Sequence, residues 1–134
     1  MREVAWHAAA DTCPPRICAD VEQRAAWRCE YCHAPQRVSG YRFHLEHIIP
    51  RAQGGSDAPS NQALACATCN LAKADRTAGI DPRTEVQVAL FNPRTHVWED
   101  HFRWAKDQQT ILGRTPTGRA TIATLLIPAL IARH

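Results

Sequence analysis

The chain has 134 residues, a formal net charge of +3 and six cysteines, with 45% hydrophobic and 22% charged residues. This length suits one domain with its own core, and the composition excludes a disordered tail or a collagen-like repeat. The mild basic excess permits a nucleic-acid partner without requiring one. The most apolar run, residues 121–132, contains Pro128 and is shorter than the roughly 20 residues that cross a bilayer. We therefore expect a soluble, cytoplasmic protein that does not associate with membranes.

The first 76 residues are expected to contain an irregular lead-in, residues 1–16, and a core, residues 17–76. Apolar spacing predicts the helices, alternating and aromatic residues predict the strands, and glycine, proline and serine predict the loop. In chain order these elements are a helix over 17–27, a tight turn over 29–32, a strand over 41–46, a loop over 50–60, a strand over 63–66 and a helix over 67–74.

The remaining residues, 77–134, are expected to form a hairpin and a helix, so that residues 1–134 make a single domain. Strands over 85–91 and 97–104 would flank the turn-forming residues 92–95. Thr115 and Pro116 have the sequence of a helix cap followed by proline at the first helical position. The apolar stripe of this helix, which would kink or end near Pro128, would consist of Ile122, Leu125, Leu126, Leu130 and Ile131.

Four of the six cysteines form two C-x-x-C pairs, Cys29 with Cys32 and Cys66 with Cys69. A two-residue spacer in a turn lets two thiolates bind one ion at about 2.3 Å, and two such turns complete a tetrahedral site. The spacing predicts a closed structural zinc site made by all four thiolates, with strands and a loop between the pairs.

Redox chemistry, disulfides and haem compete with zinc as roles for these cysteines. A redox C-x-x-C needs only one pair, usually in a βαβ setting that is absent, and disulfides do not suit a reducing compartment. The run from Cys29 to His33 matches C-x-x-C-H, the haem attachment motif, but haem would leave the second pair without a role. Cys13 and Cys18 have no obvious partner, and we expect them to be free or buried thiols.

The residues between the two cysteine pairs, together with the one directly after the second pair, have the chemistry that phosphodiester hydrolysis needs. Glu46 offers hard oxygen ligands for Mg²⁺ or another divalent cation. The imidazole of His47 can accept a proton from water near neutral pH. Asn70, in the helix expected after the second pair, can supply an amide oxygen. A base, a metal with open positions and nearby cations together suit this reaction.

The segment from Cys29 to Lys73 resembles the HNH endonucleases, whose pattern is C-x-x-C, Asp/Glu-His-Ile-x-Pro, Asn, and C-x-x-C-His/Asn-x-x-Lys. The resemblance covers about a third of the chain. It implies an α+β fold with a small ββα-metal core, stabilised by the four-cysteine zinc site. We expect the C-terminal β-hairpin and helix to pack on this core.

The same resemblance implies roles for individual residues. His47 would be the general base, Glu46 and Asn70 would bind the catalytic divalent cation, and Asn61 would hold the loop that aims the base. Asn70 stands where the family name has its final histidine, so an H-N-N variant with an altered metal preference is expected. His44 shares a strand face with Glu46 and is a further candidate for contact with metal or phosphate.

The implied reaction is an in-line attack of water on phosphorus, with a catalytic Mg²⁺, Mn²⁺ or Ni²⁺ ion stabilising the leaving 3′ oxygen. Arg51, Lys73 and Arg76 are the candidates for contact with the nucleic-acid backbone. DNA is the expected substrate, RNA is not excluded, and the protein would act as a monomer or homodimer. The alternatives are a zinc-knuckle nucleic-acid-binding module without catalysis and an RNA-directed nuclease on the same core.

Overall fold

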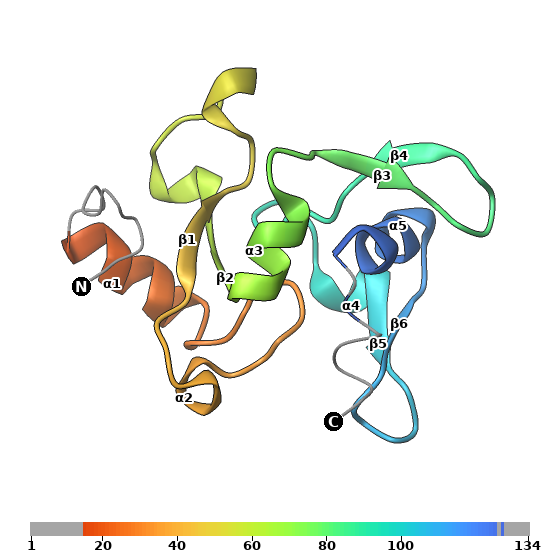
Figure 1. Ribbon diagram of the computed structural model, residues 1–134, viewed down its shortest axis with the longest axis horizontal. Helices are drawn as coiled ribbons and strands as arrows, with labels where there is room; N and C mark the ends of the chain where they lie inside the picture. The colour runs from red at the N-terminus through yellow and green to blue at the C-terminus, as the bar shows by residue number, and fades with distance from the viewer. Residues whose placement is uncertain (1–14, 126, 128–134) are drawn as a thin grey trace. The chain divides into compact units, whose positions relative to one another are not determined.

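The computed structural model describes residues 15–125 and 127, and its short helices and two-stranded sheets confirm the α+β class (Figure 1). The chain divides into two compact units, residues 1–67 and 68–134. Within the described residues, no helix has the length and apolar character needed to cross a membrane.

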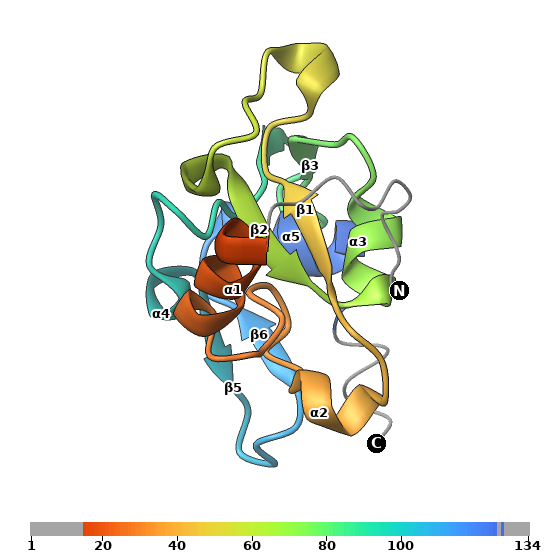
Figure 2. The same cartoon turned by 90° about the vertical axis from the view of Figure 1, so that its left-hand side faces the viewer.

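The first unit is built on one antiparallel hairpin. Figure 2 shows helix α1 against this hairpin and the connecting loop extending beyond the ends of the strands. In the pairing register, Glu46 lies opposite Ala63, and His47 lies opposite Gln62. The elements are α1 (Pro15–Arg24), α2 (Gln36–Ser39), β1 (His44–His47), the 3-10 turns η1 (Arg51–Gln53) and η2 (Pro59–Asn61), and β2 (Gln62–Ala65).

Helix α1 ends at Arg24, three residues before the expected end, because a Schellman motif closes it. Ala26 adopts a left-handed conformation, φ 56°, and donates its amide hydrogen to the Gln23 carbonyl at 3.0 Å. The next amide, of Trp27, donates to the Glu22 carbonyl at 2.9 Å. These are the two hydrogen bonds of that motif. The usual signal for it is glycine, and alanine occupies the position here.

Strand β1 begins at His44, three residues later than expected, although Tyr41 and Phe43 have high strand propensity. The backbone of these residues is bonded to side chains around α2. The Phe43 amide donates to Gln36 Oε1 at 2.8 Å, and the Ser39 hydroxyl donates to the Tyr41 carbonyl at 3.0 Å. Their side chains still pack as a tilted aromatic pair, with ring centroids 5.9 Å apart.

In the second unit, helix α5 packs against two separate hairpins. The core of this second unit contains the buried side chains of Phe91, Phe102, Ile111 and Leu125. Helix α3 begins at the last residue of the first unit, close to the expected bounds. The elements are α3 (Ala67–Lys73), β3 (Ala78–Ile80), β4 (Gln87–Ala89), α4 (Trp98–His101), β5 (Phe102–Trp104), β6 (Ile111–Gly113) and α5 (Pro116–Leu125).

The expected hairpin between segments 85–91 and 97–104 is wrong. Strand β4 pairs with β3, strand β5 pairs with β6, and residues 98–101 are helical. Two aspartates close the real turns: Asp81 accepts the Arg83 amide at 3.0 Å, and Asp107 accepts the Thr110 amide at 2.9 Å. Each aspartate side chain accepts a backbone amide of its own turn. A hairpin can therefore form without the glycine that usually marks such a turn in a sequence.

The predicted cap of the last helix is confirmed, since Thr115 Oγ1 accepts the Gly118 amide hydrogen at 3.0 Å and Pro116 is the first helical residue. Ile122 is only half-buried, whereas Leu125 is fully buried. The buried face otherwise uses small residues, Gly118, Ala120 and Thr121. Leu126, Pro128, Leu130 and Ile131 lie outside the described residues.

Candidate metal centre and active site

The four paired cysteines come together, as their spacing predicts. All four are buried and outside any disulfide bond, and their sulfur atoms lie within 4.8 Å of one another. Sγ of Cys32 and Sγ of Cys66 are 3.8 Å apart, well beyond the roughly 2.05 Å of a disulfide bond. The four residues therefore form one group that can hold a metal ion.

The geometry of this group fits zinc. Ligands about 2.3 Å from a tetrahedral centre are about 3.8 Å from each other, which matches the Cys32–Cys66 separation. The first pair sits in a tight turn in which the Cys32 amide donates to Cys29 Sγ at 3.5 Å. His33 closes this turn with φ 68°, and its amide donates to the Cys29 carbonyl at 2.9 Å. Four thiolates would leave the ion no open position for a substrate.

The remaining two cysteines differ from the pairs. Cys18 is buried but is disulfide-bonded, so the expectation of a free thiol is wrong for this residue. That expectation rested on the lack of an obvious partner in the sequence, and the sequence alone does not say which two sulfur atoms the fold brings within bonding distance. Cys13 lies outside the described residues.

Both spacer residues of the first cysteine pair are bonded to the β1–β2 hairpin. Glu30 makes two hydrogen bonds with Leu64 of β2: its amide donates to the Leu64 carbonyl at 2.8 Å, and its Oε2 accepts the Leu64 amide at 2.9 Å. Tyr31 is 1% exposed, and its hydroxyl donates to Glu46 Oε1 on β1 at 2.7 Å. The turn that presents two thiolates therefore also orients the candidate metal-binding carboxylate.

Glu46 lies in the interior of β1 and is 5% exposed. A buried carboxylate is costly unless it is hydrogen-bonded, paired or bound to a metal, so its burial agrees with a ligand role. His44 is half-buried on the same strand, two positions before Glu46, and shares its face as expected.

His47 is the last residue of β1 and contacts a carboxylate that sequence reasoning did not single out. Its Nε2 lies 2.8 Å from Oδ1 of Asp57. Arg51 donates from Nε to the same oxygen at 2.8 Å. The hydrogen bond from Arg51, followed by the one from His47, holds the pKa of Asp57 below its ordinary value. The His47 side chain is 22% exposed, so solvent reaches the imidazole.

Asn61 ties together the two ends of the loop that follows β1. Its Oδ1 accepts the Ile49 amide at 2.9 Å, and its Nδ2 donates to the carbonyls of Ile49 at 3.0 Å and Ser56 at 2.8 Å. Gly55 makes this closure feasible, because a Cβ at that position would lie 1.7 Å from the Ile49 carbonyl oxygen. Asn61 thus makes the contacts that a loop-holding residue needs.

Of the remaining predicted site residues, Arg51 belongs to the first unit, whereas Asn70, Lys73 and Arg76 belong to the second. Asn70 follows Cys69 on α3 and is half-buried. Lys73 is 2% exposed, and a lysine buried to this degree is normally paired inside the protein. Arg51 and Arg76 are exposed and are better placed to meet a phosphate from solution.

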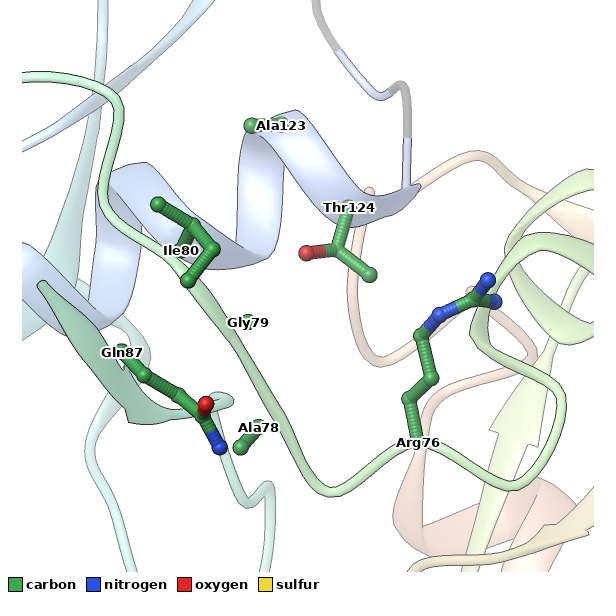
Figure 3. Close-up of a pocket in the computed structure, with 7 residues that line it drawn as sticks. All are labelled: Arg76, Ala78, Gly79, Ile80, Gln87, Ala123 and Thr124. Atoms are coloured by element: carbon green, nitrogen blue, oxygen red, sulfur yellow. The ribbon is translucent and has the colours of Figure 1, made fainter. Parts of the chain in front are cut away.

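Arg76 also lines an open pocket of about 450 Å³ between the β3–β4 hairpin and α5. Its Nη1 donates to the Ala72 carbonyl at the end of α3, at 2.8 Å. Figure 3 shows Arg76 and Thr124 on one side of Gly79, with Gln87 on the other side. The polar side chains that line the pocket therefore lie on both sides of Gly79.

Sequence reasoning missed Tyr31, Asp57 and Gly55. Tyr31 was visible only as a spacer between two cysteines, and Asp57 only as one of several polar loop residues. Their roles depend on pairing across 15 and 10 residues, respectively. Gly55 carried a usable signal, because consecutive glycines in a loop often mark a close backbone approach.

Comparison with known proteins adds one finding. Residues 29–76, about a third of the chain, match the family model described as HNH endonuclease. This span contains both cysteine pairs, the β1–β2 hairpin and α3. Neither a curated protein nor a solved structure gave a significant match.

Proposed function

From the HNH endonuclease domain that the chain carries at residues 29–76, we propose that this protein is a metal-dependent endonuclease that hydrolyses phosphodiester bonds in DNA. The domain itself supports a nuclease or nucleic-acid-binding role. The observation that favours catalysis is the arrangement on β1, where the buried carboxylate of Glu46 precedes the solvent-accessible imidazole of His47.

The proposed division of labour separates the frame from the chemistry. Cys29, Cys32, Cys66 and Cys69 would hold a structural zinc ion. Glu46 and Asn70 would hold a Mg²⁺, Mn²⁺ or Ni²⁺ ion, with His44 as a further candidate ligand. When bound, this second ion supplies Lewis-acid stabilisation of the charge that develops on the leaving 3′ oxygen.

The remaining steps belong to side chains of the chain itself. His47 takes a proton from the attacking water, and Asn61 keeps the loop after β1 closed so that the imidazole keeps its orientation. Arg51 and Arg76 contact the phosphate backbone. Lys73, which is buried, supports α3 in this scheme. The expected products carry a 5′ phosphate and a 3′ hydroxyl.

A comparison of wild type with His47→Ala tests the proposal. We expect cleavage of supercoiled plasmid by the wild type with Mg²⁺, Mn²⁺ or Ni²⁺, and none with EDTA. His47→Ala should lower the rate by about 10²- to 10⁴-fold, because a general base contributes roughly that factor. Zinc content, melting temperature and DNA affinity should stay unchanged, because other residues provide them.

Glu46→Ala provides the matched comparison. It should also lose activity, but raising the concentration of the divalent cation should restore part of it, whereas excess metal should not restore His47→Ala.

The non-catalytic zinc-knuckle module is the second candidate, favoured if wild type and His47→Ala bind DNA equally and neither cleaves under any metal. Faster cleavage of a single-stranded RNA than of the matching DNA would favour an RNA-directed nuclease. A monomer has one active site, so nicked circles should appear before linear plasmid unless the protein dimerises.

A further inference from the structure

One carboxylate oxygen next to the proposed base is shared by two donors. Asp57 Oδ1 lies 2.8 Å from His47 Nε2 and 2.8 Å from Arg51 Nε. The Asp57 side chain is 64% exposed, so burial does not force this contact. The contact therefore depends on how the backbone of the loop positions residue 57.

The backbone of Asp57 is anchored to the same hairpin that carries His47. Gln62 donates from Nε2 to the Asp57 carbonyl at 2.9 Å. Gln62 is 5% exposed and lies directly opposite His47 in the β1–β2 register. One pair of facing strand residues therefore carries the imidazole, through His47, and anchors the backbone of residue 57, through Gln62.

The chemistry of the acceptor determines which nitrogen of His47 carries hydrogen. An ionised carboxylate can only accept hydrogen bonds, and the donation from Arg51 keeps Asp57 ionised by lowering its pKa. The Nε2 atom of His47 must then be the donor. In the neutral ring the other nitrogen, Nδ1, has no hydrogen and offers a lone pair.

We propose that Asp57 is a positioning residue, whose carboxylate holds His47 with hydrogen on Nε2 and so makes Nδ1 the atom that accepts the proton from water. This role rests on the proposed nuclease function, because the proton transfer from water to His47 is a step of that reaction. Water gives one proton to Nδ1, its oxygen bonds to phosphorus, and the bond from phosphorus to the 3′ oxygen breaks with its electron pair on that oxygen. A solvent proton completes the 3′ hydroxyl, and His47 returns its proton to solvent.

Arg51 has a second part in this arrangement, beyond contact with phosphate. It donates to the same Asp57 oxygen that faces the imidazole, so it restrains the acceptor that His47 uses. Asp57 Oδ1 therefore bonds both to Arg51, in the loop, and to His47, at the end of β1.

The kinetic test uses Asp57→Ala and Asp57→Asn in the zinc-loaded full chain, at saturating divalent cation, with a defined DNA duplex. Both variants remove the charge, but the asparagine Oδ1 can still accept from Nε2. We expect kcat to fall about 10- to 100-fold in Asp57→Ala and less than about fivefold in Asp57→Asn, with KM within about threefold of wild type. Asp100→Ala, which removes an exposed carboxylate from α4, should leave both constants unchanged.

A spectroscopic test follows the imidazole directly and does not need cleavage. In ¹⁵N-labelled wild type, with His47 assigned by its loss in His47→Gln, we expect the signature of hydrogen on Nε2 alone. Asp57→Ala should show a mixture of both tautomers, and Asp57→Asn should resemble wild type.

Several results would overturn the proposal: unchanged kcat in Asp57→Ala, equal loss of kcat in both variants, or hydrogen on Nδ1 in the wild type. If the wild type cleaves nothing under any metal, the proposed nuclease function fails. The imidazole spectra then still decide whether Asp57 sets the tautomer.

Discussion

The hydroxyl of Tyr31 stands between the cysteine turn and the carboxylate expected to bind the second metal. It donates at 2.7 Å to Glu46 Oε1, and both side chains are buried. Groups that hydrogen-bond to metal ligands fix ligand orientation and typically change metal affinity by about 10- to 100-fold. Tyr31 is therefore a residue whose effect should appear in metal activation rather than in proton transfer.

Tyr31→Phe should raise the concentration of Mn²⁺ needed for half-maximal cleavage by about tenfold, while the rate at saturating Mn²⁺ stays near that of wild type. Cleavage rates measured over a range of Mn²⁺ concentrations check this, with zinc content as a measure of the intact frame. Tyr41→Phe is the control, because the Tyr41 hydroxyl is hydrogen-bonded to the Ala67 backbone near the paired cysteines and not to Glu46. Equal activation curves for wild type and Tyr31→Phe would show that the hydroxyl has only a structural role.

At the scale of residues, the sequence was enough to predict which side chains could bind metal, but not which other side chains they would contact. The spacing of Cys29, Cys32, Cys66 and Cys69 was enough to predict one cluster, because two C-x-x-C turns have few other uses in one short chain. The contact of His47 with Asp57 could not be predicted, since it depends on the path of the loop between these residues, which are ten positions apart in the sequence. No periodic pattern describes such a path.

At the scale of elements, the loop after β1 is organised by one buried amide. Asn61 uses its side-chain oxygen and nitrogen in three hydrogen bonds to the backbone of Ile49 and Ser56. Its own carbonyl accepts the Ile48 amide at 2.9 Å. This set requires an amide, because one end must accept hydrogen and the other must donate it twice.

Asn61→Asp should therefore destabilise the protein by about 2–3 kcal/mol, because an oxygen would replace Nδ2 and face two carbonyl oxygens. Urea denaturation measures this loss. Cleavage should fall at least tenfold at a temperature where the variant is folded, because the base loses its orientation. Asn92→Asp is the matched control: Asn92 Oδ1 accepts the Arg94 amide at 2.8 Å, and a carboxylate accepts it equally well. Equal stability of Asn61→Asp and wild type would contradict this role for the Asn61 amide.

The prediction of elements succeeded where hydrophobic pattern and caps agreed, and failed where side chains bonded to the backbone. Helix α5 was predicted from Thr115 and Pro116, and its cap is present. The C-terminal hairpins were misassigned because Asp81 and Asp107 close turns without glycine. Strand and turn propensities describe averages, and a single side-chain acceptor can override them.

At the scale of the whole chain, an ion pair with a buried carboxylate joins the β3–β4 turn of the second unit to α5. Asp81, in the turn between β3 and β4, is fully buried and accepts two hydrogen bonds from Arg119 of α5, each 2.9 Å long. Arg119, and then the Arg83 amide and the Thr84 hydroxyl, hold the pKa of Asp81 well below its ordinary value. The carboxylate form is therefore favoured in the folded state.

Stability should accordingly depend on pH through Asp81. A folded pKa below the unfolded value of about 3.9 gives stabilisation that is complete above that value and is lost as the pH falls through the folded pKa. Asp81→Asn should lower the melting temperature by about 5–10 °C at pH 7, with a smaller difference from wild type at pH 3. Asp20→Asn, which changes an exposed residue of α1, is the control. A difference of the same size at both pH values would contradict this assignment.

Because Glu30 and Tyr31 are hydrogen-bonded to the β1–β2 hairpin, the first cysteine turn cannot be replaced by a C-x-x-C turn of another sequence without loss of these contacts. A C-x-x-C turn transplanted from another zinc protein would supply the same two thiolates. A turn with other spacer residues would lack the Glu30 carboxylate that accepts the Leu64 amide and the Tyr31 hydroxyl that donates to Glu46. Such a chimera should load zinc and still respond poorly to the second metal. The unit that can be exchanged between proteins of this kind is therefore the turn together with its hairpin.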